Sequence, residues 1–107
     1  MERPRGRETG WGQPGLFLVE RSLPEVGTED LRACRTVLVE TCRRLARRGH
    51  WVRYLRSILA PAEGRCFCLF EAPDPETVRL ANETAQLPFA RIYAVVDLPV
   101  TEVEGTT

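Results

Sequence analysis

The order of helix and strand signals along the chain predicts a single α+β domain of the form β-α-β-β-α-β. Two segments show apolar residues at helical spacing, and each segment has its own start and stop signals. Short apolar segments that are bounded by glycine or proline precede, separate and follow these helices, as strands do. The length of 107 residues is that of one ordinary domain.

The first strand and the first helix follow each other near the N-terminus. The apolar segment LFLVER at 16–21 lies between a glycine and a proline, which indicates a strand. Thr28 is a suitable N-cap, and apolar residues then recur at helical spacing up to Leu45. Gly49 ends this helix, and four arginines precede it, where the helix dipole favours cations.

The second half of the chain predicts a hairpin, a helix and a last strand. Residues 51–59 and 65–71 have the composition of two strands, and a turn that contains proline and glycine joins them. Asp74 and Pro75 supply an N-cap and a first helical residue for the second helix, which a later proline ends. The last strand is predicted at 92–98.

This order of elements is that of the ferredoxin-like fold, a four-stranded antiparallel sheet with both helices on one face. The other face of the sheet is then uncovered, although the third and fourth strands carry apolar side chains on both faces. We therefore expect a homodimer through the open sheet face, a dimeric α+β barrel that encloses a pocket for a small molecule. The domain is predicted at 16–100, between a mobile extension at 1–15 and a tail at 101–107.

Composition excludes several classes of function. Fifteen basic and fifteen acidic residues cancel, so neither a nucleic acid nor a membrane is an expected partner. All basic residues are arginine, which excludes enzymes that depend on a lysine amine, and no glycine-rich motif predicts a nucleotide cofactor. The absence of a signal sequence or an apolar span predicts a cytoplasmic protein with four reduced cysteines.

Few side chains are suited to bind a divalent metal. His50 is the only imidazole, and it is either a ligand or a solvated residue at the end of a helix. Glu20 and Glu71 each lie in an apolar strand, where a carboxylate requires a partner. That partner is a metal, a substrate or an arginine, for which Arg53, Arg56 and Arg91 are the nearby candidates. The two acids are expected at opposite ends of the sheet.

Two cysteines of the third strand lie on one strand face. Cys66 and Cys68 are separated by one residue, so their Cα atoms are roughly 7 Å apart. They are either soft metal ligands, which would need a further ligand from elsewhere, or small apolar residues of the core.

Four segments resemble a family of small ferredoxin-like proteins, long catalogued as a domain of unknown function, that includes a dimeric nickel-binding protein. The segments are FLVER at 17–21, YLRSIL at 54–59, CLFEAPDPETVR at 68–79 and LPFARIYAVVDL at 87–98. The resemblance implies a dimer of this fold that binds a divalent metal such as nickel through surface carboxylates and imidazoles. Under this hypothesis the ligands are drawn from His50, Glu20, Glu71 and Cys68.

Two other hypotheses remain open at this point. One is a cofactor-independent enzyme, a cyclase, isomerase or monooxygenase, that acts on an aromatic or polyketide-like molecule held on the sheet face. Its acid, base or anion-stabilising groups would come from five candidates, Glu20, Tyr54, Arg56, Tyr93 and Arg91. The other is an interaction module that uses the arginine-rich N-terminal extension as a tether.

Overall fold

The computed structural model describes residues 15–22 and 28–98. Within them the order of elements is the predicted one. The elements are β1 (Gly15–Ser22), α2 (Thr28–Arg47), β2 (Arg53–Ala60), the short 3-10 helix η1 (Pro61–Glu63), β3 (Arg65–Ala72), α3 (Pro75–Thr84) and β4 (Arg91–Val95).

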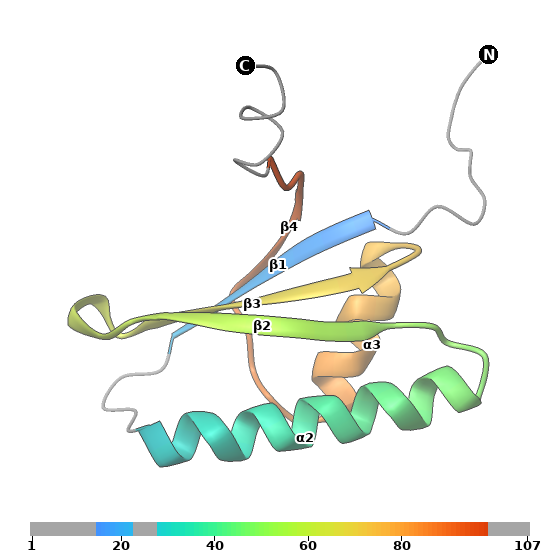
Figure 1. The fold of residues 1–107 in the computed structure, drawn as a ribbon, viewed down its shortest axis with the longest axis horizontal. Coiled ribbons are helices and arrows are strands. Elements are labelled where there is room, and N and C mark those ends of the chain that lie inside the picture. Colours follow the sequence, from blue (N-terminus) through green and yellow to red (C-terminus); the bar gives the residue numbers. More distant parts are fainter. Residues whose placement is uncertain (1–14, 23–27, 99–107) are drawn as a thin grey trace, which may run out of the picture.

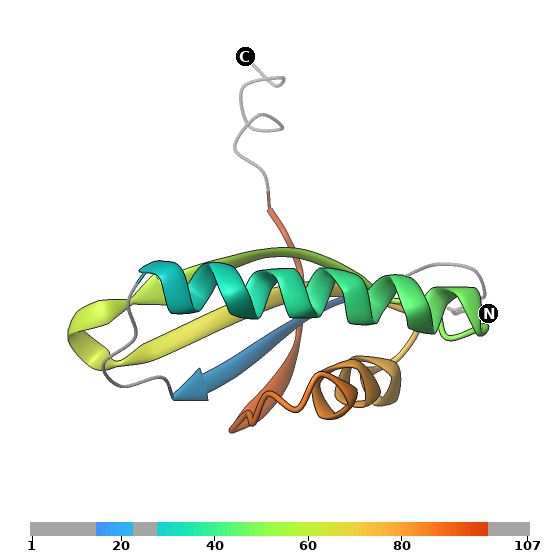
Figure 2. The same cartoon turned by 90° about the horizontal axis from the view of Figure 1, so that it is seen from below.

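The four strands form one antiparallel sheet in the order β2-β3-β1-β4. Helix α2 runs lengthwise along β2, and α3 packs against β3 and β4 on the same side of the sheet (Figures 1 and 2). The predicted ferredoxin-like α+β fold is therefore confirmed for the described residues. Among these residues, no helix is both long enough and apolar enough to cross a membrane.

The core lies between the sheet and the two helices. Alternate residues of β1 and β3 point into it, as the period of two along a strand requires. The helices complete the core with one apolar stripe each. Its buried residues are Phe17, Val19, Cys66, Cys68, Phe70 and Ala72 from the sheet, Leu38, Cys42, Leu45, Val78 and Ala81 from the helices, and Val52.

One position of the core face of β1 holds a charged residue. Arg21 follows Phe17 and Val19 on this face, and its side chain is only 2% exposed. Its guanidinium donates hydrogen bonds to the carbonyl oxygens of Leu87 and Pro88, at 3.1 and 3.0 Å, and to Oδ1 of Asn82. Arg21 thus ties β1 to α3 and to the segment that leads into β4. The sequence pattern gave no sign of this role.

Two of the helix boundaries follow the predicted signals, whereas α3 ends at Thr84, before the proline that was predicted to end it. Asp74 precedes α3, and its Oδ1 accepts hydrogen bonds from the backbone N–H and the hydroxyl of Thr77, at 2.8 and 2.6 Å. Helix α2 ends at Arg47, and Gly49 follows it with a φ of +93°, a conformation that favours glycine. The predicted start of α3 and the predicted end of α2 are therefore observed within two residues.

The last strand is shorter than the predicted 92–98. It pairs with β1 from Arg91 to Val95, and Val95 lies opposite Leu16. Because β1 begins at Gly15, the residues after Val95 have almost no neighbouring strand left to pair with. Residues 1–14 of the predicted extension and the predicted tail at 101–107 lie outside the described residues, and the fifteenth residue opens β1.

Candidate functional site

The sheet face opposite the helices is apolar in its middle. The strand register places the side chain of every second residue of each strand on this face, except at the bulge in β2. Ile58 is 55% exposed and Tyr93 is 36% exposed, which are high values for such large side chains. We call this surface the open face. Its apolar residues are Leu16, Leu18, Ile58, Phe67, Leu69, Tyr93 and Val95.

Glu20 lies at one end of the open face within a polar cluster. Its Oε2 is 2.6 Å from Nη1 of Arg65, and its Oε1 accepts a 2.8 Å hydrogen bond from the hydroxyl of Tyr93. The guanidinium of Arg91 lies 5.8 Å from the centre of the Tyr93 ring. The expected arginine partner is therefore present, but it is Arg65 and not one of the three arginines that were predicted.

Glu71 lies at the opposite end of the open face, as predicted. It is opposite Arg53 of β2, and the two side chains approach to 3.6 Å. Along β1 the register places Glu71 opposite Leu16, four residues from Glu20. Four residues of a strand span about 13 Å, so the two carboxylates cannot share one ion within a single chain.

The other two predicted ligands do not join these acids. Cys68 is on the helix face, only 3% exposed, and its Sγ lies 3.0 Å from Oγ of Ser57 and 3.8 Å from Sγ of Cys66. His50 is exposed and lies between α2 and β2. No group of three or more His, Cys, Asp or Glu side chains suited to a metal exists among the described residues.

Burial disfavours the thiolate form of two core cysteines, Cys66 and Cys42. It raises the pKa of Cys66 from 9.0 to about 11, and the neighbouring Cys68 adds to this rise. Burial likewise raises the pKa of Cys42 to about 11. Metal binding and nucleophilic attack both require the thiolate. Both thiols are buried within the hydrophobic core.

The five candidate residues of the enzyme hypothesis fall into separate places. Glu20, Tyr93 and Arg91 form the polar cluster at one end of the open face. Tyr54 pairs with Phe70 and so faces the helices, whereas Arg56 pairs with Leu69 and so belongs to the open face. The structure therefore gathers three of the five.

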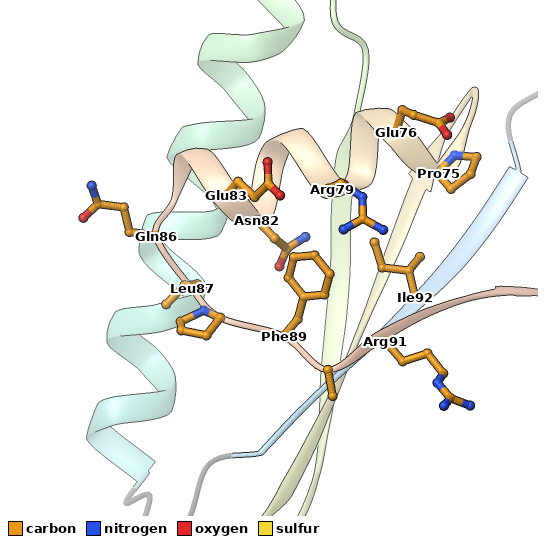
Figure 3. Close-up of a pocket in the computed structure, with 12 residues that line it drawn as sticks. Pro75, Glu76, Arg79, Asn82, Glu83, Gln86, Leu87, Phe89, Arg91 and Ile92 are labelled. Atoms are coloured by element: carbon orange, nitrogen blue, oxygen red, sulfur yellow. The ribbon is translucent and has the colours of Figure 1, made fainter.

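A groove that the sequence did not reveal lies between α3 and the segment leading into β4 (Figure 3). Its cavity volume is about 810 Å³. The guanidinium of Arg79 lies 5.4 Å from the centre of the Phe89 ring at its wall. Asn82 is fully buried, and its amide is used within the fold, by Arg21 on one side and by a 2.8 Å bond to the Val78 carbonyl on the other. The buried amide of Asn82 is thus engaged in holding the fold together.

Comparison with known proteins gives the family. The model of a family described as "Nickel responsive protein SCO4226-like" matches residues 17–95, from β1 to the end of β4. The chain belongs to this family. The resemblance inferred from the four sequence segments is thereby confirmed.

A solved member of the same fold supports the architecture. The crystal structure of SCO4226 from Streptomyces coelicolor A3(2) superposes with a TM-score of 0.67 and 19% sequence identity. The match covers 78% of this chain and 99% of that chain. At this identity the likeness shows the shared fold alone. No curated protein matches the chain.

Proposed function

We propose that this protein binds nickel and acts as a homodimer. The observation that carries the proposal is the family match, which covers both helices and all but the first two residues of the described sheet and whose description is nickel-responsive. We add two parts to this proposal, a second copy as the partner of the open face and metal ligands drawn from both copies.

The open face favours a second copy of the same chain as its partner. An apolar centre that includes Ile58 and Tyr93 is costly to leave in water. Each end of the face carries a glutamate paired with an arginine, Glu20 with Arg65 and Glu71 with Arg53, and Arg91 adds a second arginine at the Glu20 end. A surface with both signs of charge at its two ends is compatible with itself under two-fold symmetry.

A second copy also doubles the available ligands. Nickel is well served by imidazole nitrogen, and His50 is the nitrogen ligand that each copy would contribute. Glu71 lies at the same end of the sheet, because its partner Arg53 begins the strand that follows His50. Glu20 lies at the far end and Cys68 on the helix face. We therefore propose His50 and Glu71, drawn from two copies, as the metal ligands.

The test is a calorimetric titration of reduced, tag-free protein with nickel, and with zinc and cobalt for comparison. We expect micromolar or tighter nickel binding at a whole-number stoichiometry per dimer. His50→Ala should weaken it by at least about tenfold. Glu63→Gln, which changes an exposed acid in η1, serves as the control and should leave it unchanged. The absence of nickel binding would overturn the function, and unchanged affinity in His50→Ala would remove His50 from the site.

A further inference from the structure

We propose that a pocket between α2 and the edge strand β2 binds a small oxyanion, a phosphate or carboxylate group. The pocket has a cavity volume of about 270 Å³. Arg32 and Arg35 of α2 line it from one side, and Tyr54, Arg56 and Ser57 of β2 line it from the other. We call it the bulge pocket. It lies outside the sites proposed for nickel.

An irregularity in β2 builds the pocket. Tyr54 pairs with Phe70 and Arg56 pairs with the preceding residue of β3, so Leu55 is an extra residue between them. Such a β-bulge turns the side chains that follow it. As a result Tyr54 and Ser57, three residues apart, share the helix face, and the Tyr54 hydroxyl lies 2.6 Å from Oγ of Ser57.

Three arginines, Arg32, Arg35 and Arg56, line this small volume. Burial raises the pKa of Tyr54, whereas the hydrogen bond to Ser57 and the positive charge of Arg35 act in the opposite direction. The two described salt bridges engage Arg53 and Arg65 and therefore leave the pocket arginines out. Guanidinium groups bind carboxylate and phosphate in a paired geometry, and an anion between them offsets their mutual repulsion.

A chain of hydrogen-bonding groups connects the pocket to the core. Sγ of Cys66 lies 3.8 Å from Sγ of Cys68, which lies 3.0 Å from Oγ of Ser57, and Ser57 in turn contacts the Tyr54 hydroxyl. When each group donates toward the pocket, the hydrogen of the Tyr54 hydroxyl is left to donate to a ligand. The anion would then accept a hydrogen bond from the Tyr54 hydroxyl in addition to those from the arginines.

The volume limits the ligand to a small group. Pockets for drug-sized molecules occupy roughly 300 to 1,000 Å³, and the bulge pocket, at about 270 Å³, lies just below this range. A phosphate or a short carboxylate fits such a space. The inference is therefore distinct from the aromatic substrate that the enzyme hypothesis places on the sheet face.

The test follows the arginine side-chain N–H signals by NMR while the full chain is titrated with inorganic phosphate and, separately, with acetate. Low ionic strength, about 20 mM, limits screening. We expect saturable changes in the chemical shifts of these signals with at least one of the two anions. The anion that binds more tightly identifies the preferred group. The double variant Arg32→Gln/Arg35→Gln should weaken binding by at least about tenfold. Tyr54→Phe should weaken it by about threefold.

Controls separate this site from general charge effects and from the nickel proposal. Arg47→Gln removes an exposed arginine of the same helix that does not line the pocket, and it should bind the anion as the unchanged protein does. Nickel affinity should be the same in the double variant. The absence of saturable shifts with either anion, or equal weakening by Arg47→Gln, would overturn the proposal. If the double variant does not fold, Tyr54→Phe and Arg56→Gln supply the same comparison.

Discussion

Replacing the buried Arg21 with methionine should destabilise the protein strongly. The side chain is 2% exposed and donates to three acceptors, the carbonyls of Leu87 and Pro88 and Oδ1 of Asn82. Methionine fills a comparable apolar volume but donates no hydrogen bond. The substitution therefore isolates the loss of the three bonds more cleanly than alanine, which would also leave a cavity.

The magnitude follows from the burial of the three acceptors. An acceptor left without a partner costs about 1 to 3 kcal/mol, depending on its access to water. Leu87 and Pro88 are not fully buried, so each of their carbonyls should cost about 1 kcal/mol, and the buried Asn82 about 2 kcal/mol. The sum is about 4 kcal/mol, a large part of the 5 to 15 kcal/mol typical of a small domain.

Urea denaturation, followed by circular dichroism, measures the free energy of unfolding directly. The double variant Arg21→Met/Asn82→Leu also removes the Asn82 acceptor, together with its bond to the Val78 carbonyl, so it should recover up to about 2 kcal/mol relative to the single variant. Arg79→Met is the matched control, because this arginine is exposed on α3 and stacks only on Phe89, and it should cost less than about 1 kcal/mol. A loss below about 1 kcal/mol in Arg21→Met would refute the reasoning.

Three further predictions concern the interface, the thiols and a helix cap. Ile58→Arg should convert the expected dimer to a monomer in sedimentation velocity, whereas Val37→Arg, at a similarly exposed site on α2, should leave it a dimer. If both variants remain dimers, or if both become monomers, the open face is not the interface. Burial raises the pKa of Cys42 and of Cys66 from 9.0 to about 11 in the folded chain. Between about pH 9 and pH 11 the folded chain therefore binds more protons than the unfolded chain does. Stability should therefore be constant below about pH 9 and fall from there to about pH 11, by at most about 3 kcal/mol per thiol; urea denaturation that gives equal stability at about pH 8 and about pH 10.5 would contradict this. Asp74→Ala should cost about 1 kcal/mol in the same assay through loss of the cap of α3, and Asp74→Asn, which can still cap, should cost less.

The order of elements and the helix ends could be predicted because their signals are local. Asp74 caps α3 through a bond to a residue three positions away, and Gly49 follows α2 with the positive φ that glycine tolerates. The alternation of β3 likewise placed Cys66 and Cys68 together on one face. Each of these features depends on residues that are close in the sequence.

The contacts that define the candidate sites depend on register, which the sequence does not reveal. Arg65 meets Glu20 because β1 and β3 pair with Glu20 opposite Phe67, so that Arg65 is a diagonal neighbour. A register shifted by one residue would have placed these side chains on different faces. Arg21 escaped prediction for a related reason, since its acceptors lie more than 60 positions away in the sequence.

The bulge in β2 shows how one residue changes the functional interpretation. Strict alternation would place Tyr54 and Arg56 on the same face, as partners in one catalytic site. The extra residue, Leu55, instead sends Tyr54 toward the helices and Arg56 toward the open face. Arg56 nevertheless lines the bulge pocket at the strand edge, so it is the one residue that borders both proposed surfaces. If two copies pack through the open face, oxyanion affinity should therefore differ between dimer and monomer, and a comparison of phosphate titrations of the unchanged protein and of Ile58→Arg measures this difference. Equal affinities would mean that the pocket and the dimer interface are energetically independent.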